Sequence, residues 1–210
     1  MQSMATSGNR LLLSLMALPL LLVTAFAARA EPTEAEAREL VEQTAEKVIR
    51  EIGENRAAIK EDPEALLQIV DRILLPHVDS ERMSRLVLGR YYRRATAQQL
   101  ASFTREFQRL LVRTYAGPLS DLGNQEIAIV DSRPAGRDDE LLVETEVRGG
   151  DLGTVPVAYR LAVVDGQWQS FDVVVDGISL VNNYRGSFAQ KIQRDGLDGL
   201  IATLREQNRG

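Results

Sequence analysis

The fold class is decided by ELLVETEVR at residues 140–148, TVPVAYRLAVV at residues 154–164 and QWQSFDVVV at residues 167–175. Each segment alternates apolar side chains with polar or small ones, which is the period of a strand with one buried face. Asp165-Gly166 separates the last two segments and is a strong hairpin signal. With a further strand at 125–131 and a turn rich in Gly, Pro and Asp at 133–139, the pattern predicts a twisted four-stranded antiparallel meander.

The alternation also predicts which side chains of the meander share a face. In the third strand we expect one apolar face made of Val155, Val157, Tyr159, Leu161 and Val163. In the fourth strand we expect Phe171, Val173 and Val175 on one face, with Trp168, Ser170, Asp172 and Val174 on the other. An apolar sheet face of this kind must be covered by helices.

Helical patterns lie on both sides of the strands. Apolar residues recur at three- and four-residue spacing in the predicted helices, and Thr96 with Gln99 forms a capping box. The expected helices are Thr33–Arg56, one from Asp62-Pro63 to before Pro76, Ser80–Leu88, one from Thr96 towards Gly117-Pro118, Ser179–Arg194, and a short one around Leu197–Leu204. Helices, then strands, then helices predict an α+β fold rather than an alternating α/β fold.

The first thirty residues have the pattern of a signal peptide. Leu11–Ala27 is an uncharged run rich in Leu, and Ala28-Arg29-Ala30 fits cleavage after Ala30. An uncleaved membrane anchor is the alternative, although Pro19 interrupts the run. We therefore expect residues 1–30 to be a signal peptide and residues 31–210 to form a single domain, secreted into the periplasm of a Gram-negative bacterium.

Composition excludes several classes of function. The chain has no Cys and one His among 210 residues, which argues against thiolate metal sites, cysteine nucleophiles and His-rich metal sites. The formal net charge is −5, and nucleic-acid-binding proteins are usually basic. We expect no catalytic residues, no metal, no cofactor and no nucleic-acid partner.

Three groups of residues are weak candidates for chemistry. His77 could act as a general base, but no nucleophile accompanies it, so a turn residue is the simpler interpretation. Asp172 and Asp176 are too far apart on one strand to form an acid–base pair, and a solvated face and a turn are expected for them. The cluster RYYRR at residues 90–94 could contact a phosphate or a partner protein, or could be a solvated loop.

The apolar faces of the predicted sheet and helices can be buried in two ways. The helices and the sheet can meet in a dry core, or they can stand apart and enclose a cavity. The periodicity of the sequence does not distinguish these outcomes.

Several short stretches resemble the MlaC family, the periplasmic phospholipid shuttles of the Mla lipid-asymmetry pathway, also called the toluene-tolerance family. They are ILLPHVD at residues 73–79, MSRLVLGRYY at 83–92, LVRTYA at 111–116, DVVVDGISLVNNYR at 172–185 and GLDGLI at 196–201. The likeness runs from about residue 34 to residue 206, whereas residues 123–165 match only in their strand pattern.

The resemblance implies a soluble, cone-shaped α+β carrier that is not an enzyme and holds a glycerophospholipid by its acyl chains. It implies two membrane partners: the substrate-binding ring of an inner-membrane Mla ABC transporter and an outer-membrane lipoprotein–porin complex. Together with the faces above, it predicts that the acyl pocket is lined by Val112, Tyr115, Leu119, Val157, Tyr159, Leu161, Val173, Val175, Ile178, Leu180, Tyr184 and Phe188.

Two other functions stay open from the residues alone. One is a pocket-bearing α+β enzyme that uses a carboxylate as acid or base. The other is a periplasmic adaptor with a dry core that binds only proteins. Val157 and Val173 discriminate between the dry-core adaptor and a carrier, because bulk added at these positions would fill a lipid pocket but strain a packed core. Turnover of an ester or isomerase substrate would favour the enzyme.

Overall fold

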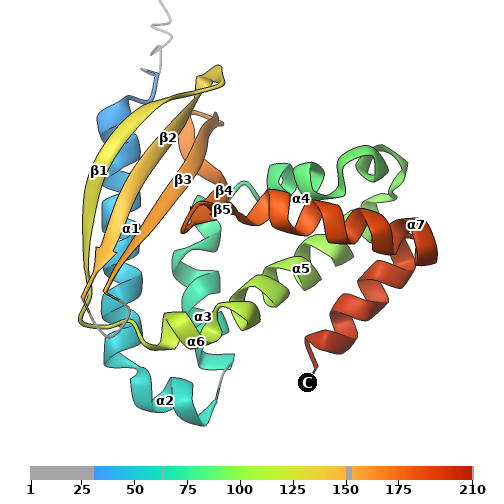
Figure 1. Ribbon diagram of the computed structural model, residues 1–210, viewed down its shortest axis with the longest axis horizontal. Coiled ribbons are helices and arrows are strands. Elements are labelled where there is room, and N and C mark those ends of the chain that lie inside the picture. The colour runs from blue at the N-terminus through green and yellow to red at the C-terminus, as the bar shows by residue number, and fades with distance from the viewer. Residues whose placement is uncertain (1–30, 63, 150–152, 210) are drawn as a thin grey trace, which may run out of the picture. The chain divides into compact units, whose positions relative to one another are not determined.

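Figure 1 shows the computed structural model, which describes residues 31–62, 64–149 and 153–209. The expected signal peptide and its cleavage site lie outside the described residues, as do Pro63 and Gly150. None of the helices in the described part combines the length and the apolar character that a membrane span requires.

The N-terminal helices begin at the expected caps but end earlier than expected. α1 (Glu34–Glu54) starts with a capping box in which the Thr33 hydroxyl accepts from the Glu36 N–H at 3.3 Å. Asn55 separates it from α2 (Arg56–Glu61), a short helix that the periodicity did not predict. α3 (Glu64–Ile73) and the 3₁₀ turn η1 (Leu75–His77) follow.

The next helices match the sequence pattern closely. α4 (Ser80–Leu88) is capped by the Asp79 carboxylate, which accepts from the Arg82 N–H at 2.9 Å. After η2 (Gly89–Arg94), the long helix α5 (Ala97–Thr114) begins at the predicted Thr96–Gln99 capping box. The short α6 (Ala116–Ser120) ends this helical segment.

The sheet has five strands rather than four. β1 (Glu126–Ala135), β2 (Arg137–Arg148), β3 (Thr154–Val164), β4 (Gln167–Val175) and β5 (Ile178–Ser179) pair in chain order, all antiparallel. The turn expected at 133–139 is much tighter, because β1 and β2 are separated only by Gly136, whose φ of +87° suits glycine. The α+β class is as predicted, and the extra strand is a two-residue edge.

A bulge in β4 reverses part of the predicted face assignment. Arg160 pairs with Asp172, but Leu161 pairs with Ser170, so Phe171 has no partner in the ladder. Ser170 therefore shares the face of Leu161, and the prediction that Phe171 lies with Val173 was wrong. One inserted residue shifts the two-residue period of a strand, and nothing in the local alternation signals it.

Behind the bulge, Asp172 is buried rather than solvated as predicted. Its two carboxylate oxygens accept from the Ser179 hydroxyl at 2.6 Å and from the Val181 N–H at 3.1 Å. Phe171 lies beside it between the guanidinium groups of Arg82 and Arg160. Asp172 thus holds the N-terminus of α7 against the sheet.

α7 (Leu180–Gln207) contains both of the helices expected at the C-terminus. They adjoin at Gly196, whose φ of +73° and ψ of 173° bend the helix without an intervening loop. The bend lets both halves of α7 pack along α4 and α5 (Figure 1).

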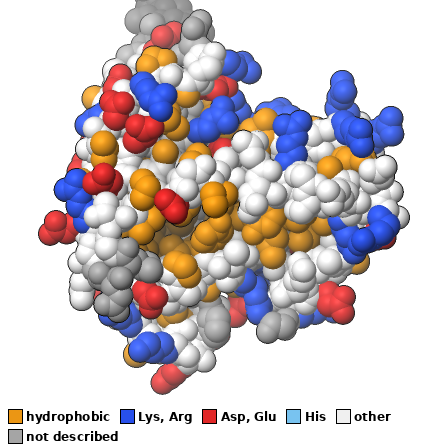
Figure 2. Space-filling model, in the orientation of Figure 1, with side chains coloured by type: hydrophobic (Ala, Val, Ile, Leu, Met, Phe, Trp, Pro, Cys, Tyr) orange, Lys and Arg blue, Asp and Glu red, His pale blue; other side chains and the backbone are white. Residues whose placement is uncertain are grey.

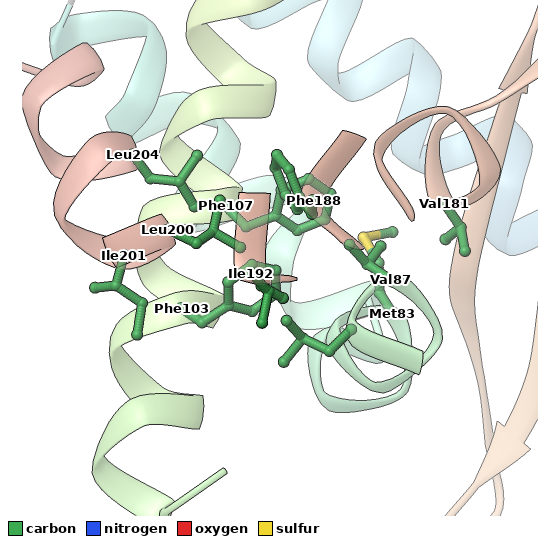
Figure 3. Close-up of a cluster of buried hydrophobic side chains, with 11 residues drawn as sticks. Met83, Val87, Phe103, Phe107, Val181, Phe188, Ile192, Leu200, Ile201 and Leu204 are labelled. Atoms are coloured by element: carbon green, nitrogen blue, oxygen red, sulfur yellow. The ribbon is translucent and has the colours of Figure 1, made fainter. Parts of the chain in front are cut away.

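Aromatic rings from α5 and α7 pack together in a cluster of buried hydrophobic side chains (Figure 3). Phe103 and Phe107 stack with ring centroids 5.6 Å apart, and Phe188 meets both rings edge-on. We call the whole group the packed cluster: Met83, Val87, Leu88, Phe103, Phe107, Val181, Phe188, Ile192, Leu200, Ile201 and Leu204. It joins α4, α5 and α7 away from the sheet.

Candidate functional site

A cavity of about 370 Å³ lies between the sheet and the helices α1, α3, α5 and α6. The surface in Figure 2 shows hydrophobic side chains gathered around a hollow between the sheet and α7. The lining of the cavity includes Leu40, Val41, Thr44, Val48, Leu74, Leu75, Gln108, Val112, Tyr115, Leu119, Val157, Tyr159, Leu161, Ser170, Val173, Val175 and Leu180. None of the described lining residues is Lys, Arg, Asp or Glu.

The sheet wall of the cavity follows from strand register. Val157 pairs with Val175, and Tyr159 pairs with Val173, so these side chains rise from one face in neighbouring rows. Valine is branched at Cβ and has a restricted rotamer, so it cannot extend to fill space in front of it. The side chains of this wall are apolar but short, so space remains between them and the facing helices.

The helix wall comes from the C-terminal end of α5 and from α6. Val112, Tyr115 and Leu119 line the cavity as expected. With the five sheet residues and Leu180, nine of the twelve residues named from the sequence lie on the wall.

The other three residues lie elsewhere. Ile178, on the edge strand β5, is 57% exposed. Phe188 belongs to the packed cluster, and the ring of Tyr184 lies 5.2 Å from that of Phe107. The reason is that α7 leaves the sheet directly after Leu180 and packs against α4 and α5 instead of across the cavity.

The sequence interpretation missed the opposite wall. Leu40, Val41, Thr44 and Val48 of α1, and Leu74 near the end of α3, face the sheet across the cavity. The apolar stripe of α1 was visible in the sequence, and it signals a buried helix face. It does not signal which part of the sheet that face will meet.

Few polar groups reach the cavity. Gln108 is occupied by a hydrogen bond from its amide to the Ser80 hydroxyl at 2.7 Å. Burial raises the pKa of Tyr159 to about 12, so its hydroxyl stays protonated. Burial, helped by the nearby charge of Lys47, lowers the pKa of His77, which is therefore neutral at pH 7. The described part of the lining is therefore uncharged at neutral pH.

This chemistry does not suit acid–base catalysis. Asp172 is bound to the start of α7, Asp176 sits in the exposed turn after β4, and neither lines the cavity. Among the described residues no group of three His, Cys, Asp or Glu side chains could hold a metal ion. His77 lines the cavity, but none of the described lining residues is a carboxylate that could orient it as a general base.

Fold and cavity define a class: an α+β protein whose helices stand off a twisted sheet and enclose an uncharged apolar space. The chain belongs to the MlaC family, since the family model described as MlaC protein matches residues 42–206. This confirms the resemblance found in the sequence.

Individual relatives agree with this assignment. The chain is 31% identical to the toluene tolerance protein ttg2D of Pseudomonas putida over 163 residues, 76% of this chain and 74% of that protein. It is 29% identical to the intermembrane phospholipid transport system binding protein MlaC of Haemophilus influenzae over 171 residues, 80% of this chain and 79% of that protein.

A solved structure is similar over most of the fold. It is the phospholipid-binding protein from Ralstonia solanacearum in complex with a phospholipid, with a TM-score of 0.76 and 28% sequence identity. The match covers 83% of this chain and 97% of that one. The predicted α+β class is thereby confirmed. Two of these relatives are named for phospholipid binding or transport, and the chain, as a member of the MlaC family, is not an enzyme.

Proposed function

We propose that this protein is a carrier that binds a diacyl glycerophospholipid by its acyl chains in the cavity described above. The observation that carries the proposal is the lining, which is apolar, uncharged and left open between sheet and helices. The Ralstonia solanacearum relative, which was solved with a phospholipid, supports it. The lipid is cargo, and the proposal requires no cofactor.

The physical need for such a carrier follows from the hydrophobic effect. A two-chain lipid in water exposes roughly 30 methylenes at about 0.8 kcal/mol each, so it leaves a bilayer very slowly. A cavity that buries comparable apolar area removes most of this barrier. The carrier need not bind the lipid more tightly than a membrane does.

Nine residues of the wall are the proposed acyl contacts: Val112, Tyr115, Leu119, Val157, Tyr159, Leu161, Val173, Val175 and Leu180. Burying a phosphate among them would be costly, because none of the lining residues that the structure describes is a cation that could pair with it. The head group therefore stays near solvent, and selection among head groups and chain lengths is weak.

The finer proposal concerns where the carrier works. It exchanges lipid in the periplasm between an outer-membrane lipoprotein–porin complex and the substrate-binding ring of an inner-membrane Mla ABC transporter, and so maintains outer-membrane lipid asymmetry. The name of the Haemophilus influenzae relative, a binding protein of an intermembrane phospholipid transport system, supports this. Residues 1–30 are proposed to be a cleaved signal peptide and residues 31–210 the lipid-binding domain. The cap at Thr33 places the first helix directly after the proposed cleavage site.

Native mass spectrometry of the protein purified from the producing bacterium tests the carrier function. The expected result is an added mass of about one phospholipid per chain, which exchanges with labelled lipid from vesicles. A protein that is ligand-free as purified and takes no lipid from vesicles would overturn the proposal and favour the dry-core adaptor. Turnover of an ester or isomerase substrate would favour the enzyme instead.

A further inference from the structure

Positive charge is concentrated in the helices that carry the packed cluster. Residues 82–122 and 178–210 contain 13 Lys and Arg but only 5 Asp and Glu. The rest of the chain after residue 30 contains 10 Lys and Arg and 25 Asp and Glu. The protein is acidic in total and yet has one strongly basic part.

Five arginines on α4, η2 and α7 form the centre of this part, and we call them the arginine cluster: Arg85, Arg90, Arg93, Arg94 and Arg185. All five are exposed, and none lies within salt-bridge distance of a carboxylate in the part of the chain that the structure describes. Figure 2 shows Lys and Arg side chains gathered at the end of the molecule where η2 and α7 lie.

Neutral aromatic groups hold two of these arginines in place. Arg90 donates to the Tyr91 hydroxyl at 2.8 Å, with its guanidinium 4.9 Å from the ring centre. Arg85 lies 5.9 Å from the centre of the Tyr92 ring, whose hydroxyl donates to Glu81. These contacts order the side chains without neutralising their charge.

The backbone at Gly89 lets α7 contribute Arg185 to the cluster. Gly89 begins η2 with a φ of +54°, and the Arg185 guanidinium of α7 lies 3.4–3.7 Å from where a Cβ on Gly89 would be. A side chain at position 89 would crowd Arg185 and strain the turn. Glycine therefore allows an arginine from a distant segment to join those of η2.

We propose that the arginine cluster docks the protein on the phosphate-rich surface of an anionic bilayer. Arginine pairs well with phosphate oxygens, and clustered basic residues next to tyrosines suit a membrane–water interface. A protein interface centres on a buried apolar anchor, but the two exposed large hydrophobic residues of the described chain, Val130 and Ile178, are on the sheet. The acidic remainder of the chain is repelled by the same surface, which fixes the orientation of docking.

Docking and cargo binding use different residues. None of the five arginines of the cluster is among the described lining residues of the cavity. Arg93 and Arg94 precede α5, and about 15 residues of helix, or roughly 22 Å, separate the start of α5 from Val112, which lines the cavity. The proposal rests on surface charge, so it does not depend on what the cavity holds.

Vesicle flotation with the purified protein tests this inference. Vesicles of phosphatidylglycerol and phosphatidylethanolamine are compared with vesicles of phosphatidylcholine, at low salt and at 0.5 M salt. The wild-type protein is expected to bind only the anionic vesicles and to be released by salt, because screening shortens the range of surface charge. The triple variant Arg90→Gln/Arg93→Gln/Arg94→Gln is expected to bind about 100-fold more weakly, or about fivefold for each charge removed.

The matched control is Lys47→Gln/Arg50→Gln/Lys60→Gln, which removes the same charge from exposed sites on α1 and α2. It is expected to bind as the wild type does. Equal weakening in both triple variants would mean that net charge alone acts, and would overturn the inference. So would wild-type protein that ignores anionic vesicles, or that binds an acidic protein through the cluster without binding vesicles. Lipid content by mass spectrometry, measured on the same samples, reports separately on the carrier function.

Discussion

The packed cluster and the cavity wall are both rich in apolar side chains, and yet one is filled and the other is hollow. In the packed cluster, long aromatic rings from α5 and α7 interdigitate, and Phe103 is fully buried. On the sheet wall, Val157, Val173 and Val175 are only partly buried although helices cover that face. Side-chain length and helix path, rather than hydrophobicity, therefore decide whether an apolar face packs or leaves space.

The largest expected effect on stability is in the packed cluster. Phe103→Ala should lower the free energy of unfolding by about 3–5 kcal/mol, because it removes a buried ring and leaves a void between α5 and α7. Urea unfolding with and without added lipid measures this loss, which should be the same in both conditions. A loss below about 1 kcal/mol would contradict the dense packing seen around this ring.

A smaller effect is expected at the polar contact that ties the end of α7 to α5. The buried Glu106 carboxylate accepts from Arg205 at 3.4 Å and from Asn208 at 3.1 Å. Glu106→Gln should cost about 1.5–3 kcal/mol at pH 7, since it removes the negative charge that pairs with Arg205 and makes the bond from Asn208 a neutral one.

The pH dependence of that cost has a defined sign. Burial raises the pKa of Glu106, but the hydrogen bonds from Asn208 and Arg205 outweigh it and leave the pKa below the ordinary 4.5. The stabilisation is therefore complete above pH 4.5 and is lost as the pH falls through the lower folded-state pKa. When the wild-type protein and Glu106→Gln are unfolded at stepwise lower pH, their free energies of unfolding should converge. If the difference in free energy of unfolding stayed constant into the acid range, the charge of Glu106 would not be what stabilises the fold.

The smallest expected effect on stability, with a large effect on cargo, is at the cavity wall. Val173→Trp should change the free energy of unfolding by less than about 1 kcal/mol, because the ring enters open space instead of the filled core where added bulk costs about 1–3 kcal/mol. Bound lipid per molecule should fall. Ile178→Trp is the matched control on the exposed edge strand, and it should leave both quantities unchanged. Thermal melting and lipid content are measured on the same samples. Unfolding of Val173→Trp with unchanged lipid per folded molecule would favour a dry core.

The elements that could be predicted well are those defined by local chemistry. β3 and β4 have the bounds that their alternation and the Asp165-Gly166 turn predicted, and α4 and α5 begin at their predicted caps. Backbone hydrogen bonding at a cap or turn involves neighbours in the chain, so the sequence within a few residues is enough to place it.

The misassigned residues depended on contacts between distant segments. Phe171 changed face because β4 bulges against β3, and Asp172 was buried because the start of α7 folds back onto it. Phe188 was expected to help close the cavity, but it packs against α4 and α5 in the packed cluster.

The α+β class, most helix and strand bounds, and the apolar character of the faces that meet inside all follow from local sequence pattern. Packing between distant segments sets the rest: α1, α5 and α6 stand off the valine-rich sheet and enclose a cavity, while α4, α5 and α7 close on each other around Phe103. The physical reason is that apolar periodicity records which side chains avoid water. It does not record which face will arrive opposite them, or how far away that face is held.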